Sequence, residues 1–163
     1  MSYYTQFPRR YDELAICLDS YKESGIAGRA YFGSRQEPTL FRDIGALLIQ
    51  FDGFLDTLGK PQASTALRRF SQKRQKNKGT KGIFTKEEVI SLKQRTDIHP
   101  KGESATFVVQ VEFRQNSTWQ GNVTWVEAGE KQNFRSALEL LMLMESAMTK
   151  DEAPENISLA EEA

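Results

Sequence analysis

The chain has very little of the residue types that build metal centres and disulfide frameworks. Among its 163 residues there is one cysteine, Cys17, and one histidine, His99. A single cysteine forms no intrachain disulfide, and one cysteine with one histidine falls short of the ligand set of a zinc or iron–sulfur site. We therefore expect no disulfide framework, no transition-metal centre and no cofactor.

Motifs for covalent catalysis and nucleotide binding are also absent. The sequence contains no G-x-S-x-G nucleophile elbow and no G-x-x-x-x-G-K-S/T phosphate-binding loop. KGTKG at residues 78–82 is a flexible glycine-containing loop without that pattern. The carboxylates are numerous, but they are spread over the faces of predicted helices. We predict that the protein is not an enzyme.

Long hydrophobic runs are missing as well. ALLI (46–49) and LELLMLM (138–144) fall far short of the roughly 20 apolar residues that span a membrane, and no charged leader with an apolar stretch begins the chain. Hydrophobic residues nevertheless make up 39% of the sequence, which is enough for a core. The sequence predicts a folded, cytoplasmic protein that does not enter the membrane.

The chain as a whole has no excess of positive or negative charge, but its three segments do. The formal net charge is zero, but residues 1–62 carry 7 basic and 8 acidic side chains, residues 63–104 carry 11 and 4, and residues 105–163 carry 4 and 10. A basic block raises the local concentration of polyanions whatever the total charge. The alternative is that the basic and acidic blocks face one another inside the monomer.

What the chain does contain is an internal repeat. Displaced by 93 residues, residues 27–62 align without a gap on 120–155, and the alignment extends back to place 14–28 on 107–121. Similar residue types recur where identity is lost, as with Phe32 and Trp125. We predict an internal duplication. The identical pairs are Gly28/Gly121, Glu37/Glu130, Phe41/Phe134, Arg42/Arg135, Leu47/Leu140, Leu48/Leu141 and Pro61/Pro154.

Each copy has the pattern of a strand, a hairpin turn, a strand and a helix. Alternating apolar residues from 107 to 113 have the period of a strand with one buried face, and Val108 is the exception on the polar face. Apolar residues recur every three or four positions over 41–58 and 134–148, as in one-sided helices. Thr39 and Asn133 are the expected N-caps, and Gly59 with Pro61 is a helix stop signal.

A lone ββα unit cannot cover its own hairpin and helix, whereas two copies can cover each other. We therefore predict an α+β fold of internally duplicated ββα units with pseudo-two-fold symmetry, built on a four-stranded sheet or two facing hairpins. Residues 1–62 form an N-terminal arm and the first copy, 63–104 a basic, partly helical connector, 105–150 the second copy and 151–163 an acidic flexible tail. These segments form one compact domain, and a homodimer is a further alternative.

The connector carries the strongest signal for a partner. Seven cations fall within 14 residues with no acid among them: Arg68, Arg69, Lys73, Arg74, Lys76, Lys78 and Lys81. Such a block is suited to a DNA or RNA backbone, with sequence-tolerant and salt-dependent affinity. A helix over 63–75 places Arg69, Lys73 and Lys76 on one face, and a capping box at Thr85 begins a short helix over 86–95. The alternatives are a basic strap over the acidic half and a solvated linker.

Three further residues are candidates for nucleic-acid binding. Arg42 and Arg135 each stand beside the start of a helix, where the helix dipole opposes a cation and an anion is needed. That anion is either a phosphate clamped by both arginines or, as we favour, the recurring Glu37 and Glu130. Trp119 at the second hairpin stacks on a base, anchors a protein partner or, as we favour, shields the core.

The stretch FRQNSTWQGNVTWVE (113–127), followed by FRSALELLMLM (134–144), resembles a recurrent pattern in short uncharacterised proteins of gut Gram-positive bacteria and their mobile elements. The resemblance covers most of the second copy and carries over no residue role. It implies a bacterial cytoplasmic setting and an association with mobile elements. Small proteins in that setting commonly bind DNA, or bind and inhibit a nucleic-acid machine such as an RNA-guided nuclease.

These observations predict a non-enzymatic nucleic-acid-binding accessory protein that contacts the DNA or RNA backbone. The alternative is a protein-binding inhibitor or adaptor of a nucleic-acid-handling machine, of the anti-CRISPR kind. Its basic block would occupy an acidic groove of the partner, or its acidic second half would mimic nucleic acid.

Overall fold

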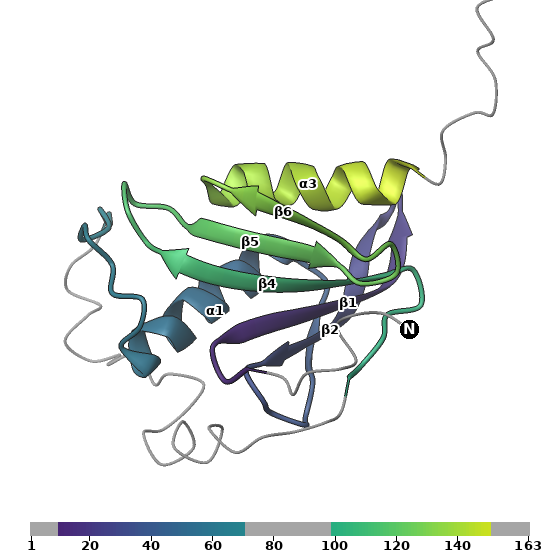
Figure 1. Cartoon of the computed structure of the whole chain (residues 1–163), viewed down its shortest axis with the longest axis horizontal. Helices are drawn as coiled ribbons and strands as arrows, with labels where there is room; N and C mark the ends of the chain where they lie inside the picture. The colour runs from purple at the N-terminus through teal and green to yellow at the C-terminus, as the bar shows by residue number, and fades with distance from the viewer. Residues whose placement is uncertain (1–9, 71–98, 151–163) are drawn as a thin grey trace, which may run out of the picture.

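The fold is described here from a computed structural model, which describes residues 10–70 and 99–150 and has the predicted α+β class. Within those residues, one sheet of six antiparallel strands is combined with two helices (Figure 1). The strands are β1 Glu13–Lys22, β2 Gly25–Phe32, β3 Thr39–Phe41, β4 Ala105–Phe113, β5 Gln120–Trp125 and β6 Glu130–Phe134. The helices are α1 Ile44–Leu58 and α3 Ala137–Lys150.

The strand order is β3-β2-β1-β4-β5-β6, so each half of the chain contributes three neighbouring strands and then a helix. The expected four-stranded sheet or facing hairpins and the expected ββα unit were therefore wrong by one strand per half. β3 has three residues, and the first four residues of β6 are exposed. Neither strand has enough alternating apolar residues to predict it from the sequence.

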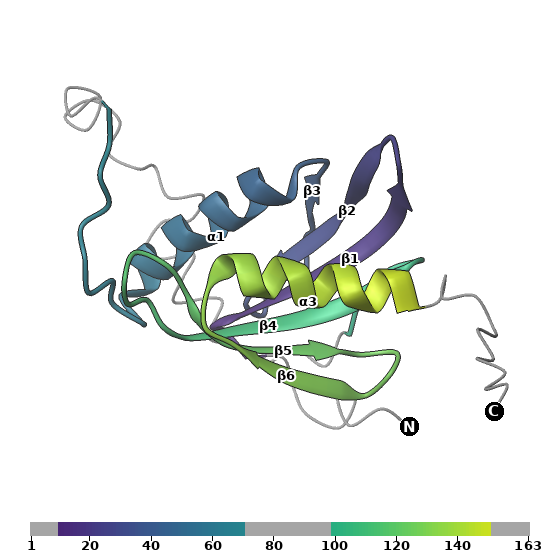
Figure 2. The ribbon, with the colours of Figure 1, turned by 90° about the horizontal axis from the view of Figure 1, so that it is seen from above.

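Both helices pack on the same face of the sheet, and the core lies between them and the strands. In Figure 2 α1 and α3 run in opposite directions, so that the start of α1 lies near the end of α3. Each helix contacts outer strands of its own half, α1 with β2 and β3 and α3 with β5 and β6. The largest fully buried core side chains include Phe32, Phe51, Phe54, Phe107, Phe134, Leu14, Ile16, Leu47, Leu55 and Leu140.

The opposite face of the sheet is buried at its centre. Ala15, Cys17 and Tyr31 form a second apolar cluster, and Val108, which pairs with Ala15 across β1 and β4, is 6% exposed. Val108 lies on the face away from the helices, as its place in the alternation predicted. Its apolar character fits this position because the central strands are buried on both faces.

The helix N-caps differ from the predicted ones, whereas the predicted helix stop is confirmed. Thr39 lies in β3, and the N-cap of α1 is Asp43, whose Oδ1 accepts a hydrogen bond from the Gly45 N–H at 2.9 Å. Asn133 lies in β6, and before α3 it is the Ser136 Oγ that accepts from the Glu139 N–H at 3.0 Å. α1 ends at Gly59 in the left-handed conformation, with φ of 73°.

Candidate functional site

The basic connector lies only partly within the described residues. Arg68 and Arg69 are described and exposed, whereas Lys73, Arg74, Lys76, Lys78 and Lys81 lie outside the described residues, as does the expected helix over 86–95. The expected helix over 63–75 is wrong for its described part, because residues 63–70 contain no helix. Instead Ala63 forms a β-bridge with Arg114, and the Ser64 N–H donates to the Arg114 carbonyl oxygen at 3.0 Å.

The two ends of the connector are attached at opposite ends of β4. The first end is held beside Arg114, directly after β4. At the other end, directly before β4, the Ser104 N–H donates to the Leu18 carbonyl oxygen at 2.7 Å and the Gly102 N–H donates to Thr106 Oγ1 at 2.8 Å. A nine-residue strand is about 30 Å long. The attachment points of the connector are therefore separated by about the length of this strand.

An ion pair on the first hairpin holds the second attachment point. Arg29 donates to both carboxylate oxygens of Asp19, at 2.8 and 2.9 Å, and to the Lys101 carbonyl oxygen at 2.7 Å. The Glu103 N–H donates to Asp19 Oδ1 at 3.2 Å. The hydrogen bond from Arg29 is the main cause of the lowered pKa of Asp19, and the hydrogen bond from the Glu103 N–H lowers it further. The hydrogen bond to Asp19 in turn raises the pKa of Arg29. Both groups stay charged at neutral pH, so the ion pair fixes residues 101–103 on the sheet.

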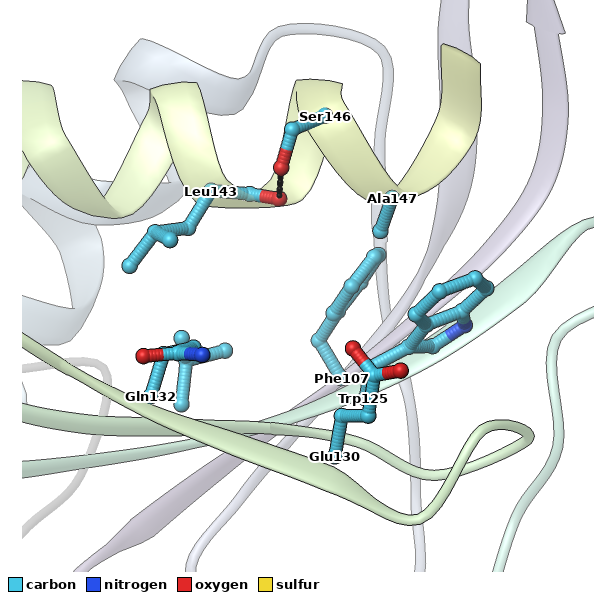
Figure 3. A pocket seen from close by; sticks show the side chains of 8 residues that line it. Phe107, Trp125, Glu130, Gln132, Leu143, Ser146 and Ala147 are labelled. Carbon is cyan, nitrogen blue, oxygen red and sulfur yellow. Dashed lines mark hydrogen bonds between the residues drawn. The ribbon is translucent and has the colours of Figure 1, made fainter. Parts of the chain in front are cut away.

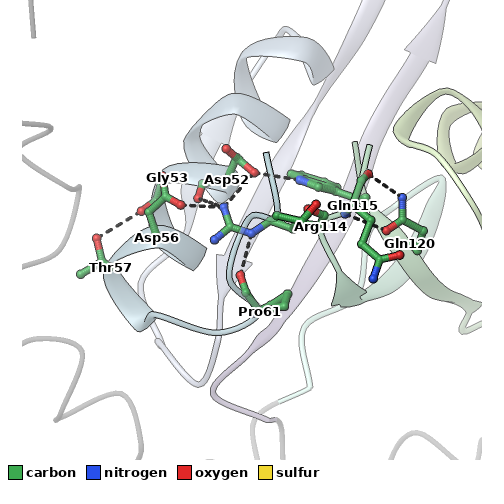
Figure 4. Close-up of polar contacts among 10 residues, drawn as sticks. Asp52, Gly53, Asp56, Thr57, Pro61, Arg114, Gln115 and Gln120 are labelled. Atoms are coloured by element: carbon green, nitrogen blue, oxygen red, sulfur yellow. Dashed lines mark hydrogen bonds and ion pairs between the residues drawn. The ribbon is translucent and has the colours of Figure 1, made fainter. Parts of the chain in front are cut away.

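A buried arginine, which the sequence analysis did not single out, holds the first attachment point (Figure 4). Arg114 is 4% exposed, and its Nε donates to the Pro61 carbonyl oxygen at 2.7 Å. Its Nη1 lies 3.2 Å from Asp52 Oδ1 and 2.7 Å from Asp56 Oδ1, both on α1. Two aspartates one turn apart on a helix indicate that a basic side chain lies nearby. The sequence gives no reason to choose Arg114 as that side chain.

Trp119 belongs to the core and is not available to stack on a base. The side chain is 5% exposed, and its Nε1 donates to Asp52 Oδ1 at 2.9 Å. Its ring meets Phe51 edge to face, with 5.9 Å between the centroids. The candidate role in nucleic-acid binding was therefore wrong for this residue, and the favoured alternative, shielding of the core, is confirmed.

Arg42 and Arg135 are both exposed, but they are not brought together. Arg42 precedes α1 and Arg135 precedes α3. Because α1 and α3 run in opposite directions, the two arginines lie at opposite ends of this pair of helices (Figure 2). A single phosphate therefore cannot be clamped by both. The favoured salt bridges were also wrong: Arg135 pairs with Glu139 at 3.0 Å, and Glu37 pairs with Arg35 at 3.5 Å. Arg135 reaches a carboxylate in the first turn of its own helix instead, which lowers the pKa of Glu139.

The arginines that belong to the sheet and helices mostly carry their own counter-charges. Of the eight described arginines, five are in ion pairs, which are Arg10, Arg29, Arg35, Arg114 and Arg135. Arg42, Arg68 and Arg69 have no ion pair within residues 10–70 and 99–150. Among the described residues, the exposed charge at the start of the connector is thus unneutralised.

Two pockets lie under α3. The first, the α3–β6 pocket, has a volume of about 250 Å³, and Leu143 and Ala147 of α3 face Trp125, Glu130 and Gln132 of the sheet across it (Figure 3). The second, which we term the hairpin pocket, has a volume of about 210 Å³ and is apolar except for Glu145 and the Tyr21 hydroxyl. Its lining residues are Leu18, Tyr21, Ile26, Ile44, Leu141, Met144, Glu145 and Met148.

Other classes of site find no support in the part of the chain that the structure describes. It contains no group of three or more histidine, cysteine, aspartate or glutamate side chains that could hold a metal ion. No described helix is long and apolar enough to cross a membrane. No protein-family model, no curated protein and no solved structure matches the chain.

Proposed function

We propose that this chain is an internally duplicated, non-enzymatic accessory protein that binds the backbone of DNA or RNA through its basic connector, in the bacterial cytoplasm and in association with mobile elements. The two units form the scaffold, and the connector supplies the charge. The observation that carries the proposal is the contrast between the described arginines of the scaffold, all of which except Arg42 are ion-paired, and the unpaired, exposed Arg68 and Arg69.

Strand register supports the duplication. In the first half Leu14 pairs with Phe32 and Gly28 with Phe41; the residues 93 positions later form the pairs Phe107 with Trp125 and Gly121 with Phe134. The irregularity between Leu18 and Ser20 recurs between Val111 and Phe113, which is the same displacement. The repeating unit is then βββα. A single shift reproduces two strand pairings and one register irregularity that were not used to choose it.

The pairing at the centre of the sheet also fits a two-fold relation. A two-fold axis between two antiparallel strands passes between residues that are equivalent to each other. Ala15 and Val108 are 93 positions apart, and they pair directly across β1 and β4. On either side, Leu14 pairs with Val109 and Ile16 pairs with Phe107. Phe107 is the residue 93 positions after Leu14, and Val109 is the residue 93 positions after Ile16. The two-fold relation therefore converts one of these pairs into the other.

The two recurring glycines have the same physical cause. A Cβ on Gly28 would collide with the Cys17 carbonyl oxygen, and a Cβ on Gly121 would collide with that of Gln110, again 93 positions further on. A polar contact recurs beside them: Arg29 donates to Asp19, and Asn122 donates to Glu112 at 2.8 Å. The strands thus approach in the same way in both halves.

Binding to a phosphate backbone follows from the charge and its attachment. Arg68 and Arg69 begin a run with five further cations in the sequence, and the run is tied to the sheet on both sides. Cations placed on phosphates release condensed counterions, which gives affinity that falls steeply with salt and depends little on base sequence. Within residues 10–70 and 99–150, no acidic side chain forms an ion pair with Arg68 or Arg69, so these two cations are open to a phosphate.

The test is a fluorescence-anisotropy titration of the full chain with short single- and double-stranded DNA and RNA. We expect binding that weakens between about 50 and 200 mM salt, with a logarithmic slope of about 0.9 per phosphate contact on duplex DNA. Reversal of Arg68, Arg69, Lys73 and Arg74 to glutamate should abolish it. The matched control reverses Lys22 and Lys131, which are exposed outside the connector. Absence of binding at low salt, or an equal loss in the control, refutes the proposal.

A second candidate function, binding and inhibition of a protein, is favoured by the outer face of α3. Leu138 and Met142 lie one turn apart and are 63% and 58% exposed, among the acidic Glu139 and Glu145. Exposed apolar residues in a row on one helix are typical of a protein-binding surface. This activity should survive reversal of the connector and should be lost with Leu138→Glu or with changes at Glu127, Glu130, Glu139 and Glu145, measured as capture and inhibition of a purified nucleic-acid-handling enzyme.

A further inference from the structure

The hairpin pocket has a filled counterpart at the other end of the molecule. The residues 93 positions from Tyr21, Ile26 and Glu145 are Arg114, Trp119 and Asp52. Arg114 and Trp119 both donate hydrogen bonds to the Asp52 carboxylate, and the Trp119 ring packs on Phe51. In that half an indole, a guanidinium and a carboxylate of the same chain occupy the space between the hairpin and the facing helix.

In the hairpin pocket two of these three groups are replaced. Ile26 stands where the counterpart has the indole of Trp119, and Tyr21 stands where it has the cation of Arg114. Met144 takes the place of the Phe51 ring. The replacement of a tryptophan by the smaller isoleucine contributes to the pocket of about 210 Å³ that remains.

The third group, the acceptor, is kept. Glu145 occupies the position of Asp52 and lines the pocket, and its carboxylate has no ion pair within the described residues. The other lining residues are Leu18, Tyr21, Ile26, Ile44, Leu141, Met144 and Met148, and Glu145 itself is exposed at the mouth of the pocket. Its carboxylate is therefore open to a hydrogen-bond donor or a cation.

We propose that the hairpin pocket binds a small aromatic cation, an aryl ring joined by a short chain to an ammonium group. The ring occupies the space that Trp119 fills in the other half, between Ile26 and Met144, and the ammonium group pairs with Glu145 as Arg114 pairs with Asp52. Methionine side chains adapt to planar rings and make favourable sulfur–aromatic contacts, which Met144 and Met148 supply here. The volume of about 210 Å³ is sufficient for one bicyclic ring.

This inference rests on the geometry of the two halves and is independent of nucleic-acid binding, because no connector residue lines the described pocket. The probe is tryptamine, which joins an indole to an ammonium group. The full chain is titrated with it, and amide chemical shifts are followed by NMR. We expect shifts centred on Ile26, Met144 and Glu145 and a dissociation constant on the order of 0.1–1 mM, which is usual for a ligand of this size.

Three comparison ligands separate the contributions of ring and charge. Indole, which has the ring without the charge, should bind about tenfold more weakly than tryptamine. Indole-3-acetate carries the opposite charge and should give no saturable shifts, and butylamine, which has the charge without the ring, should also give none. Equal binding of tryptamine and indole-3-acetate overturns the role of Glu145, and no binding of tryptamine overturns the site.

Three variants complete the test. Glu145→Gln should weaken tryptamine binding about tenfold, whereas Glu139→Gln, on the same helix but outside the pocket, should leave it unchanged. Ile26→Trp should fill the pocket, abolish tryptamine binding and raise the melting temperature by about 2–4 °C. If Ile26→Trp fails to fold, Glu145→Gln still decides. Unchanged binding in Glu145→Gln, or shifts centred on the α3–β6 pocket, contradicts the proposal.

Discussion

The hairpin of the first half, β1–β2, carries Tyr21 and Ile26 where the hairpin of the second half, β4–β5, carries Arg114 and Trp119. The strand registers of the two hairpins agree from Leu14–Phe32 to Ser20–Ala27, yet among the described residues only the second hairpin is joined to the opposite helix by hydrogen bonds, through Asp52 of α1. The first hairpin leaves a pocket at the corresponding place. Two hairpins of the same register can therefore close one end of a molecule and leave the other end open, depending on the residues near their turns.

The largest expected difference in stability between the two ends of the molecule follows from removal of the Trp119 side chain. Trp119→Ala should lower the free energy of unfolding by about 3–5 kcal/mol, because it leaves a cavity beside Phe51 and removes a donor from Asp52. Ile26→Ala, at the half-buried counterpart, should cost about 1–2 kcal/mol. Urea denaturation measures both. Equal losses would show that the two ends are equally well packed, against this comparison.

The next effect is loss of the buried guanidinium. Arg114→Met keeps the apolar stem but leaves Asp52 and the Pro61 carbonyl oxygen without this donor, and should cost about 2–3 kcal/mol. Tyr21→Met, at the exposed counterpart, should stay within about 0.5 kcal/mol of the parent. Urea midpoints again give the measurement. A loss below about 1 kcal/mol for Arg114→Met would mean that solvent replaces these contacts.

A smaller effect, and an equal one in the two halves, is expected at the glycines where strands approach closely. Gly28→Ala and Gly121→Ala should each cost about 1–3 kcal/mol, because the added Cβ meets a carbonyl oxygen of the neighbouring strand. Gly53→Ala is the matched control: it lies inside α1 with no atom near its Cβ, and should stabilise by about 0.5–1 kcal/mol. Thermal unfolding measures the loss of stability in each variant. A large loss at only one of the two strand glycines would contradict an equivalent approach of the strands in the two halves.

The smallest effect concerns the ion pair at the first hairpin. Arg29 lowers the pKa of Asp19 in the folded state. The ion pair therefore contributes to the free energy of unfolding above the pKa of about 3.9 that Asp19 has in the unfolded chain, and this contribution is lost as the pH falls through the lower pKa of the folded state. Asp19→Asn should therefore cost about 1 kcal/mol at pH 7 and progressively less below about pH 4. Unfolding curves of the parent and variant between about pH 2 and 7 provide the measurement. The Arg29→Gln variant should lose the same pH dependence, and a cost that does not change with pH would exclude the ion pair as its cause.

Much of the fold could be predicted from the sequence, because β4 and both helices have clear apolar periodicity and the 93-residue repeat extends the strands of the second half to β1 and β2. The turn after β4 was also predicted, and Asn116 and Ser117 adopt positive φ there. β3 and β6 were missed because a short or exposed edge strand takes its stability from pairing with a neighbour. Their omission also explains the two wrong N-caps.

The candidate sites were harder to predict, since they depend on residues far apart in the sequence. Trp119 looks like a hairpin tip until Asp52, on another element, is seen to accept its N–H. Arg114 follows an alternating strand in the way that an exposed arginine would. The hairpin pocket lies where four elements, β1, β2, α1 and α3, meet around the small side chain of Ile26, and no local pattern in the sequence indicates the space left there.

The single long-range strand pair has a consequence for the order in which the described structure forms. β1–β2, β2–β3, β4–β5 and β5–β6 each join neighbouring strands of the chain, whereas β1–β4 joins strands from the two halves. Each three-stranded half can thus form early, and the central pairing must wait for closure of the intervening loop. If the connector were cut, that last step would become an association of two fragments, and folding would then depend on protein concentration.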